Sequence, residues 1–513
     1  MSKFDINNFE DQEVWDLICE GRTKGVFQLE SSLGKHWAKE VKPRSISELA
    51  ALISLIRPGC LKAYTDGKSM TQHYADRKKG TDAVDYPDDS LEPILKGTYG
   101  VLVYQEQSMK IAQQLAGFDL KEADSLRKAI GKKKAELMEE MKQVFMDGAE
   151  KQGIIKKEVA GEIFSWIEKS NRYAFNKSHA VSYAIDAYWS AYCKCHRLER
   201  FYVSYMNRSD RKPKPEIELK QLIMDAKMHG LDTYPPRLNH MHTNFLHENG
   251  KIYFGMRHIK NVGTKECDKI EELKQTEDLS LFTWMDCLIK IVHRTKINKR
   301  AAIAMISVGA FNGKNNRESR QKMLYEYDSW NNLSAREKDA IADNYKSNLT
   351  LAQCVDLLSD WVKINSRRAQ AIEDIKQSLI SPFYSLDDDP ASIADYEIKL
   401  MGCALTCSKA DSINISTNMC KDVTQGTIRG KVNLSVMINS IRTYKTKKGK
   451  NPGQEMAFLC IEDASGELDS VTIFPEMFTK YKDLLIERNT VFIDGEVSKR
   501  DKNSIVVNKV IQV

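Results

Sequence analysis

The sequence predicts a multidomain, mainly α-helical protein that ends in a small β-barrel, and three observations support this fold class. The chain has 513 residues, which is too long for one hydrophobic core. Apolar residues recur at helical spacing through much of the chain before residue 426, for example over Ile46–Ile56. From residue 427 onward, short apolar runs alternate with turns, as they do in small barrels.

Composition narrows the class of protein. No apolar run approaches the roughly eighteen residues that a membrane span needs, and no apolar signal region follows the N-terminus. We therefore expect no membrane association and a cytoplasmic location. Neither Cys193 with Cys195 nor Cys403 with Cys407 has zinc-ligand or redox Cys-x-x-Cys spacing. Reduced, buried thiols are expected instead, without disulfides or a metal site.

The net charge is mild, because 77 Lys and Arg residues oppose 71 Asp and Glu residues. This balance does not by itself indicate a nucleic-acid partner. The distribution of charged residues along the chain is more informative. Cations without acids are concentrated at 127–134 and 442–450, whereas acids gather at 82–92 and 387–395. We interpret the acidic Asp387–Asp389 as solvated surface rather than as metal ligands.

The N-terminal part begins with a glycine-bounded loop at 21–32, which we expect to be buried. The helix predicted over Ile46–Ile56 must end there, because Pro58 cannot continue it. Arg57 is therefore held beside a turn, where a guanidinium can bind phosphate; an ordinary surface arginine is the alternative. The polar, turn-rich segment 70–93 is predicted to be a solvent-exposed loop region outside the core.

A cationic helix end lies at the centre of the next stretch. Ala123, Leu126 and Ile130 recur at helical spacing, and Gly131 is predicted to stop the helix. A second helix follows at once, so the lysines after Gly131 stand where free amides favour anions such as phosphate. A solvated lysine-rich corner is the alternative. The cations are Arg127, Lys128, Lys132, Lys133 and Lys134.

A long, aromatic-rich helix is predicted from Ala180 to about Met206, with Asn176–His179 at its start. Ser178 can cap this helix, while Lys177 and His179 are polar groups between apolar residues. His179 is either a satisfied structural histidine or a catalytic base. The aromatic residues of the helix are expected to pack in the core rather than to stack on bases.

Residues 253–265 combine an apolar stretch, a glycine turn and the start of a helix at Glu266. This pattern is typical of a helix-hairpin-helix, which presents backbone amides to a DNA phosphate without reading sequence. Lys260 and Lys265 lie beside the turn.

The C-terminal strands are predicted at 432–438, 456–461, 471–474, 491–494 and 505–507, with a helix near 475–485. Five strands with one helix before the fourth indicate an OB-fold, a barrel that often binds single strands. A protein-binding OB domain is the alternative. The candidate DNA-binding residues of its first hairpin are Tyr444, Lys445, Lys447 and Lys448.

Several short sequence motifs of this chain, in this order and with similar gaps, resemble those of the alpha subunits of bacterial DNA polymerase III, the C-family replicative polymerases. The matching motifs are Gly25–Ser31, Arg57–Gly59, Tyr104–Gln107, Arg127–Lys134, Gly148–Gly153 and Phe175–His179.

The resemblance implies a fingers domain that receives the incoming deoxynucleoside triphosphate (dNTP) and part of the primer-template. By resemblance, Arg127 and Lys128 match a basic pair near the nucleotide phosphates, and Lys132 to Lys134 continue that surface. The further residues carried over to nucleotide binding are Arg57, Gln105, Lys177 and His179.

The family also places a helix-hairpin-helix and an OB-fold in the later regions. Here the hairpin reads Asn261-Val262-Gly263 where the motif usually has Gly-x-Gly, so its first glycine is missing. Asn tolerates a left-handed backbone better than most residues, and the turn is expected to survive. The candidate DNA contacts are Lys260, Asn261, Gly263 and Lys265.

A further segment loosely resembles the peptide with which replicative polymerases dock on a sliding clamp. Its residues are Gln377, Leu379 and Phe383, and a simple helix exit is the alternative. The predicted domains are the fingers at 1–209, a helical tail with the helix-hairpin-helix at 210–312, a helical or linker region at 313–425, and the OB-fold at 426–513.

In the C family, a palm domain that precedes the fingers holds two Mg²⁺ ions through aspartates. We expect no catalytic residue and no metal ligand in this chain. The chain is interpreted as the C-terminal part of a split DNA polymerase, whose palm and Mg²⁺ come from a separate chain. The alternative is a non-catalytic, DNA-binding or clamp-associated replication accessory.

Overall fold

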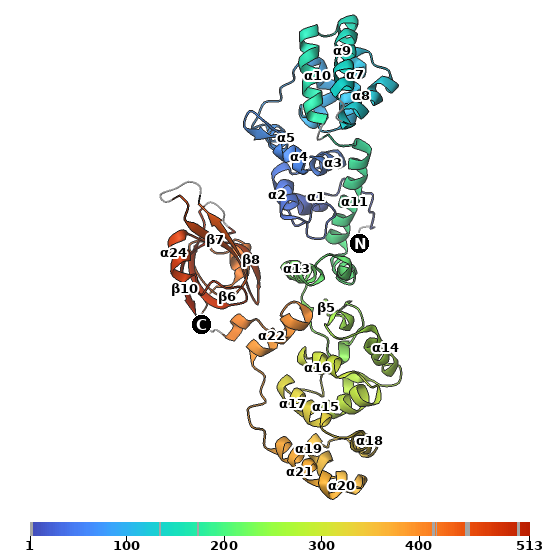
Figure 1. The fold of residues 1–513 in the computed structure, drawn as a ribbon, viewed down its shortest axis with the longest axis vertical. Helices are drawn as coiled ribbons and strands as arrows, with labels where there is room; N and C mark the ends of the chain where they lie inside the picture. The colour runs from blue at the N-terminus through green and yellow to red at the C-terminus, as the bar shows by residue number, and fades with distance from the viewer. Residues whose placement is uncertain are drawn as a thin grey trace. The chain divides into compact units, whose positions relative to one another are not determined.

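The computed structural model describes residues 4–132, 135–171, 174–412, 416, 418–446, 452–499 and 503–512 (Figure 1). The predicted site residues Lys133, Lys134, Lys447 and Lys448, and the side chain of Lys132, lie outside the described residues. The chain divides into two compact units, Met1–Phe201 and Tyr202–Val513. Each unit is described by itself.

The first unit is helical apart from a short hairpin of β1 (Tyr64–Thr65) and β2 (Lys68–Ser69). Its α-helices are α1 Gln12–Cys19, α2 Ser32–Val41, α3 Ile46–Leu55, α4 Pro58–Lys62, α5 Met70–Lys79, α6 Glu92–Leu95, α7 Gln105–Ala116, α8 Leu120–Lys132, α9 Ala135–Gln152, α10 Lys157–Asn171 and α11 Lys177–His196. Helix α12, Leu198–Met206, crosses the boundary between the units.

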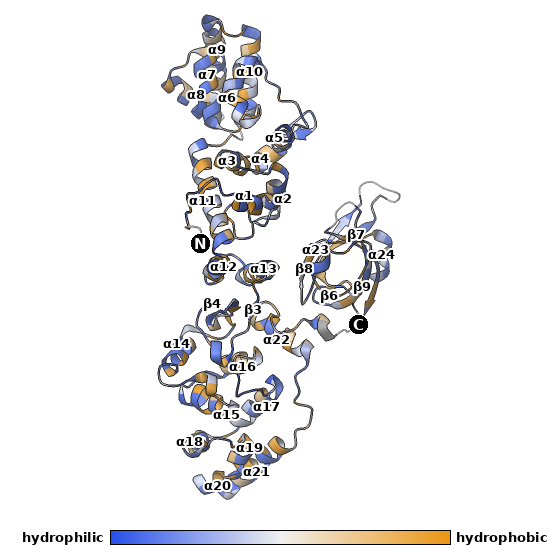
Figure 2. Cartoon of the chain, turned by 180° about the vertical axis from the view of Figure 1, so that it is seen from behind, coloured by the Kyte–Doolittle hydropathy of each residue, from blue (hydrophilic) through white to orange (hydrophobic). Residues whose placement is uncertain are grey.

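Two hydrophobic cores stabilise this unit. Helices α1, α2, α3, α5 and α11 share the first core, and α6 to α10 share the second. Figure 2 shows that α3 is apolar over much of its length, and α3 packs against α11. The segment 101–104 connects the cores, because Val103 and Tyr104 are buried in the first and Leu102 in the second.

Most element boundaries follow from local chemistry. Helix α3 ends at Leu55, as predicted. Pro58 then starts a further helix, α4, with Arg57 as its N-cap, which was not predicted.

Three predictions were wrong. The helix predicted from Ala180 to about Met206 is divided into α11, which ends at His196, and α12. Helix α8 continues through Gly131 to Lys132, so this glycine does not stop it. The segment 70–93, predicted as a solvent-exposed loop region, contains α5, whose Tyr74 is fully buried.

The second unit begins with helices and a small sheet of order β3-β5-β4, formed by β3 Thr233–Tyr234, β4 Leu246–Glu248 and β5 Lys251–Tyr253. Its other elements before the barrel are α13 Pro215–Met228, α14 Thr264–Leu273, α15 Trp284–Asp286, a π-helix Cys287–Arg294, α16 Lys299–Ser307, α17 Arg320–Asn331, α18 Ala335–Asn344, α19 Leu351–Asp356, α20 Leu358–Trp361, α21 Ser366–Ile380, α22 Pro390–Met401 and α23 Cys420–Thr424.

A buried ion pair fixes α17 against α22. The guanidinium Nη2 of Arg320 lies 2.9 Å from Oε1 of Glu397, and both side chains are buried. Glu397 also accepts hydrogen bonds from the backbone N–H groups of Leu405 and Thr406. These donors offset the cost of burying the carboxylate.

The chain ends in a closed five-stranded barrel of order β10-β8-β7-β6-β9, seen as a ring in Figure 1. Its elements are β6 Lys431–Lys445, β7 Glu455–Asp463, β8 Gly466–Ile473, α24 Pro475–Tyr481, β9 Thr490–Val497 and β10 Ile505–Gln512. β10 pairs in parallel with β8 and antiparallel with β9, and α24 precedes the fourth strand. This is the predicted OB-fold, and the multidomain, mainly helical fold class is confirmed.

The eleven cysteines are free thiols, seven of them fully or almost fully buried within helices or strands of the described chain and one, Cys403, buried after α22. Across the part of the chain that the structure describes, the helices are too short or too polar to span a membrane.

Candidate nucleic-acid interface

Backbone hydrogen bonds bring the starts of α7 and α11 together in the first unit. The N–H of Phe175 donates to the carbonyl of Val103 at 2.9 Å, and the N–H of Gln105 donates to the carbonyl of Phe175 at 3.0 Å. Two of the motifs that carry the family resemblance, Tyr104–Gln107 and Phe175–His179, therefore meet at one place.

Cations lie over aromatic rings at this junction. The guanidinium carbon of Arg57 lies 3.6 Å from the centroid of the Phe175 ring. The ammonium of Lys177 lies 5.7 Å from the centroid of the Tyr104 ring. Such contacts orient the cations while their N–H groups remain available to anions. Arg57, Gln105 and Lys177, which were separate in the sequence prediction, thus share one site.

His179 extends this site along α11. Its ring lies 4.2 Å from the Tyr183 ring and 5.5 Å from the Phe175 ring, measured between centroids. Phe27, from the loop that we expected to be buried, packs against Tyr183 at 5.2 Å and remains 39% exposed. We call Arg57, Phe175, Lys177, His179 and Tyr183 the cation–aromatic cluster.

The loop next to the cluster contains a strained residue that the sequence analysis missed. Gln28 is exposed and has φ +64°, in the left-handed region that residues other than glycine rarely adopt. Its neighbours Val26 and Leu29 are fully buried and hold the loop in place. Strain of this kind is often stored at functional sites. Nothing in the sequence of the Gly25–Ser31 motif indicated that Gln28 would have a positive φ.

The N-terminus of α11 is already occupied by an acid. The carboxylate of Glu106 accepts hydrogen bonds from the Asn176 side chain at 2.7 Å and from the Lys177 backbone N–H at 2.8 Å. Asn176 in turn caps the helix by accepting from the His179 N–H. The Lys177 and His179 amides of the first turn are thus taken, which leaves side chains as the main donors for an anion at this site. Glu106 lies in the Tyr104–Gln107 motif but was not among the predicted site residues.

Arg127 and Lys128 lie elsewhere on α8 and bind an acid of their own helix. Asp124 accepts from Nη2 of Arg127 at 2.8 Å and pairs with Nζ of Lys128 at 2.6 Å. Hydrogen bonds from Lys128 and Arg127 lower the pKa of Asp124. Among the described residues, both cations pair with Asp124 and not with the cation–aromatic cluster, although 36% and 60% of their side chains remain exposed.

A second candidate surface lies in the second unit, at the predicted helix-hairpin-helix. Asn261 has φ +73°, so it takes the left-handed conformation that the missing glycine would have supplied. Val262 is buried, and Gly263 is the N-cap of α14 without a side-chain cap. The turn survives as expected, and the exposed Thr264 and Lys265 begin the helix.

The same backbone pattern recurs before α16. Lys296 has φ +54°, Ile297 is buried, and Asn298 is the N-cap. The side-chain N–H of Asn298 donates to Glu266 on α14 at 2.7 Å, so the N-termini of the two helices are linked. The sequence had shown only the first of these turns.

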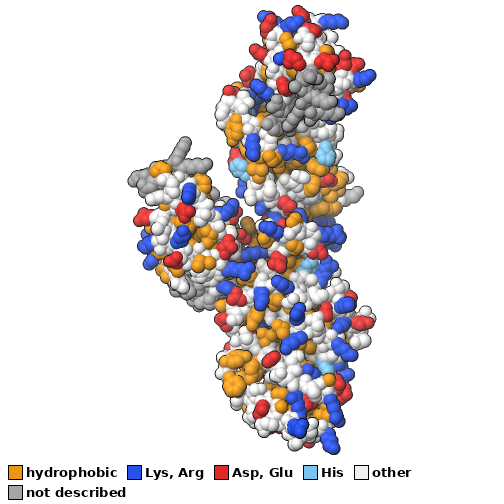
Figure 3. Space-filling model, viewed as in Figure 1, with side chains coloured by type: hydrophobic (Ala, Val, Ile, Leu, Met, Phe, Trp, Pro, Cys, Tyr) orange, Lys and Arg blue, Asp and Glu red, His pale blue; other side chains and the backbone are white. Residues whose placement is uncertain are grey.

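Exposed cations surround both helix starts. Lys260, Lys265, Lys299 and Arg300 are exposed, while Lys269 of α14 donates to the Lys296 carbonyl at 2.7 Å and ties α14 to the second turn. On the face drawn in Figure 3, Lys and Arg side chains are interspersed with Asp and Glu, so binding of phosphates must be local. Two helix N-termini with nearby lysines can bind two phosphates of a DNA backbone.

The barrel presents an aromatic and basic strip on β6 and β7. Tyr444 and Lys445 lie in the β6–β7 hairpin arm, as predicted, and Tyr444 is 45% exposed. Phe458 on β7 is 41% exposed and lies opposite Arg442 in the register. Strands two and three and the first loop form the usual ligand face of an OB-fold. Phe458 was missed because it sits within an apolar strand run.

The predicted clamp-docking residues lie at the end of α21. Gln377 is exposed and donates to Glu373, Leu379 is half-buried, and Phe383 follows the helix with 91% of its surface exposed. Ile380 and Tyr384, 57% and 59% exposed, extend this apolar patch.

Comparison with known proteins agrees with these features. A family model described as the bacterial DNA polymerase III alpha subunit finger domain matches residues 2–153, and a helix-hairpin-helix motif matches residues 230–323. The DNA polymerase III subunit alpha of Aquifex aeolicus is 32% identical over 497 residues, which is 96% of this chain. The chain is related to the bacterial DNA polymerase III alpha subunits.

Other DNA polymerase III alpha subunits match to a similar extent. Those of Borreliella burgdorferi and Bacillus subtilis are 31% and 30% identical over 99% of this chain. The chain spans only 38% to 42% of the length of these three relatives. Arg57 and Gln105 fall within the finger-domain match, and both hairpin turns fall within the helix-hairpin-helix match.

Proposed function

We propose that this chain forms the nucleotide- and DNA-binding part of a replicative DNA-directed DNA polymerase, and that a separate chain supplies the metal-binding palm. The observation that carries the proposal is the cation–aromatic cluster in a chain whose N-terminal third matches the polymerase finger domain. Because the relatives are bacterial, we place this activity in the bacterial cytoplasm.

The cluster suits the triphosphate of an incoming dNTP. Arg57 can present its planar guanidinium to phosphate oxygens while its other face rests on Phe175. Lys177 and His179 add donors in the first turn of α11. Glu106 holds the α11 start in place by accepting from Asn176 and from the Lys177 N–H. Arg127 and Lys128 would then bind a second stretch of phosphate or the primer-template.

The hairpin turns and the barrel would hold the nucleic acid. The amides at the starts of α14 and α16 suit backbone phosphates of the duplex, which carry no sequence information. The exposed Tyr444 and Phe458 suit stacking by bases of a single-stranded template. Together these contacts would position the primer end without reading its sequence.

Nucleotidyl transfer also needs Mg²⁺, which prefers ligands that are all oxygens. Among the described residues, the two groups of three possible metal ligands each contain imidazole, and one contains a thiol. These donors do not fit a pair of Mg²⁺ ions. We therefore propose that both ions are held by the palm and assign no metal-dependent step to this chain.

Primer extension tests the proposal. A labelled primer-template is incubated with Mg²⁺ and four dNTPs, with this chain alone, with a palm-bearing polymerase polypeptide from the same genome alone, and with both. We expect synthesis only in the mixture. Duplex binding by this chain, with no synthesis from the mixture, would instead support a non-catalytic accessory protein. Extension by this chain alone would refute the assignment of the palm to another chain.

We also propose that the exposed segment after α21 docks on a sliding clamp. Phe383 projects almost its whole surface to solvent, next to the exposed Ile380 and Tyr384. An aromatic anchor of this kind is the usual centre of a peptide-binding hot spot.

A further inference from the structure

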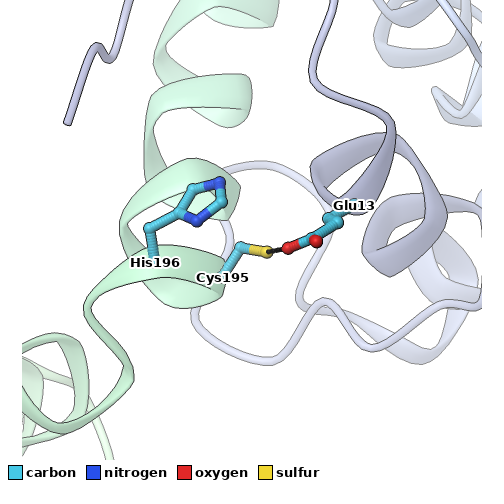
Figure 4. A group of neighbouring side chains, drawn as sticks. All are labelled: Glu13, Cys195 and His196. Atoms are coloured by element: carbon cyan, nitrogen blue, oxygen red, sulfur yellow. Dashed lines mark hydrogen bonds between the residues drawn. The ribbon is translucent and has the colours of Figure 1, made fainter. Parts of the chain in front are cut away.

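Three possible metal ligands converge where the start of α1 meets the end of α11. Glu13 lies in the first turn of α1, and Cys195 and His196 lie in the last turn of α11. One ligand atom from each residue lies within 4.8 Å of the others. Figure 4 shows the Cys195 sulfur directed toward the Glu13 carboxylate, which are 4.0 Å apart.

The imidazole of His196 is already oriented for a metal. Its Nε2 lies 2.9 Å from Oδ2 of Asp11, the N-cap of α1. This contact leaves Nδ1 as the available ligand atom, and Figure 4 shows a ring nitrogen on the side of Cys195. Metal-binding histidines usually donate their other N–H to a carboxylate, which fixes the tautomer and the ring orientation. Asp11 fills that role here.

We propose that Glu13, Cys195 and His196 bind one Zn²⁺ ion per chain, with water completing a tetrahedral site and Asp11 positioning His196. Sulfur, imidazole nitrogen and carboxylate oxygen are the three ligand types of protein zinc sites. A thiolate together with an imidazole favours Zn²⁺ over Mg²⁺ or Ca²⁺. This departs from the expectation, based on cysteine spacing alone, that the chain has no metal site.

The site forms by simple ligand exchange. Zn–S, Zn–N and Zn–O bonds to the protein form as Zn–water bonds of the hydrated ion break and that water returns to the solvent. The S–H bond of Cys195 breaks, and its proton passes to the buffer. The oxidation states of zinc and sulfur do not change. Binding therefore releases about one proton, which is measurable as a dependence of the heat of binding on the ionisation enthalpy of the buffer.

Binding would connect two elements that are far apart in the sequence. Trp15 of α1 already packs against Tyr188 of α11, with ring centroids 4.8 Å apart. Tyr188 also donates to the carbonyl of Asn8, which lies just before α1. A metal at the adjacent Glu13 and Cys195 would fasten this contact, so Zn²⁺ should raise the melting temperature of the first unit.

A second group of possible metal ligands serves as an internal control for the proposed zinc site. His240, His242 and Glu248 in the second unit also have ligand atoms within 4.8 Å of one another, but they include no thiol. Nδ1 of His240 lies 3.0 Å from Oε2 of Glu248. A metal at this group would therefore lack the optical signature of a thiolate bond.

Cobalt substitution separates the two groups. The full chain is titrated with Co²⁺ under reducing conditions, and its absorption spectrum is recorded. We expect a thiolate-to-cobalt charge-transfer band that saturates at one equivalent and disappears when Zn²⁺ is added. Cys195→Ser should abolish this band, and Cys193→Ser, two residues earlier on the same helix, should leave it unchanged. The double variant His240→Ala/His242→Ala should also retain it.

The positioning residue has its own test. Asp11→Asn keeps a good N-cap for α1 and should weaken Co²⁺ binding by about 10- to 100-fold while the band persists at saturation. Circular dichroism of each variant checks its folding. The absence of a charge-transfer band in the wild-type chain, or its persistence in Cys195→Ser, would overturn the proposal. The outcome is independent of whether the chain takes part in DNA synthesis.

Discussion

Asn261 and Lys296 adopt the same left-handed backbone conformation, and each lies two residues before the N-cap of a helix, Gly263 of α14 or Asn298 of α16. Their φ angles are +73° and +54°, and each is followed by a buried apolar residue, Val262 or Ile297. Glu266 and Asn298 then join the two helix starts through a hydrogen bond of 2.7 Å. The candidate DNA-binding surface is therefore a pair of matching turns.

A β-branched residue should disrupt the first turn. Asn261→Val should lower stability by about 1–2 kcal/mol, because a side chain in the left-handed region clashes with its own backbone. It should also weaken duplex binding, whereas Asn261→Gly should preserve both properties. The measurements are thermal melting and the Kd for a primer-template duplex.

Asn249 provides a matched control for this prediction. It has φ +51° in the turn between β4 and β5, so Asn249→Val carries a similar backbone strain. It should lower stability but leave the Kd for duplex unchanged. Equal effects of the two valine variants on duplex binding would count against the assignment of the α14 turn.

The barrel should bind single-stranded DNA through its exposed aromatic residues. Phe458→Ala should weaken binding of an oligonucleotide by about 1–3 kcal/mol, because it removes one base-stacking surface. Ile511→Ala, at a 40% exposed position on β10, is the control and should change little. Fluorescence anisotropy at fixed salt measures both, and unchanged affinity in Phe458→Ala would favour a protein-binding role for the barrel.

Clamp docking should depend on Phe383. Phe383→Ala should weaken binding to the sliding clamp of the same cell by about 2 kcal/mol or more, since truncating an interface anchor has effects of this size. Ile217→Ala, at a 53% exposed position on α13, should have no effect. Surface plasmon resonance with immobilised clamp provides the measurement. If both variants bind as the wild type does, the segment is simply a helix exit.

The region before α14 should lose stability in acid. Burial, and then the charge of Arg257, lower the pKa of His258 to about 4 from an ordinary value of 6.5. Between these pH values the unfolded state binds a proton that the folded state does not, so stability falls as the pH falls. The loss is at most about 3.5 kcal/mol at roughly 1.4 kcal/mol per pH unit.

Amide hydrogen exchange of α14 between pH 4 and 7 measures this effect. The opening free energy in wild type should decline toward acid pH more steeply than in His258→Phe, which has no titrating group at that position. Parallel pH profiles for the two proteins would show that His258 is not responsible.

Local chemistry predicted many elements from the sequence. Proline at position 58 marks the end of α3, and the alternating apolar runs after residue 427 predicted the barrel with its helix before the fourth strand. Asn261 could be placed in a left-handed turn because its side chain tolerates that conformation. These predictions succeeded because neighbouring residues determine the structure.

Long-range contacts explain what the sequence missed. The ring of Phe175 meets Arg57 only because the start of α11 pairs with the start of α7, and no spacing pattern reports that pairing. Asp124, just before the cationic run, neutralises part of it through Arg127 and Lys128. Helix α5 was missed because its sequence is polar, although tertiary packing buries Tyr74 and Ala75.

The nucleotide site is tested most directly by single-turnover incorporation with the reconstituted enzyme, as a function of dNTP concentration. Arg57→Ala should raise the apparent Kd for dNTP by about tenfold or more, the loss expected for a charge-assisted hydrogen bond to phosphate. Arg22→Ala, which removes an exposed partner of Glu20, is the control and should match the wild type. Arg127→Ala combined with Lys128→Ala should also raise this Kd more than it weakens duplex binding.

In every case the Kd for the primer-template duplex is measured in parallel. We expect Arg57→Ala to raise the Kd for dNTP while the Kd for duplex stays within about twofold, because Arg57 lies in the cation–aromatic cluster and not in the hairpin surface. An Arg57→Ala enzyme that binds dNTP as tightly as the wild type, or that loses dNTP and duplex affinity equally, would contradict this expectation.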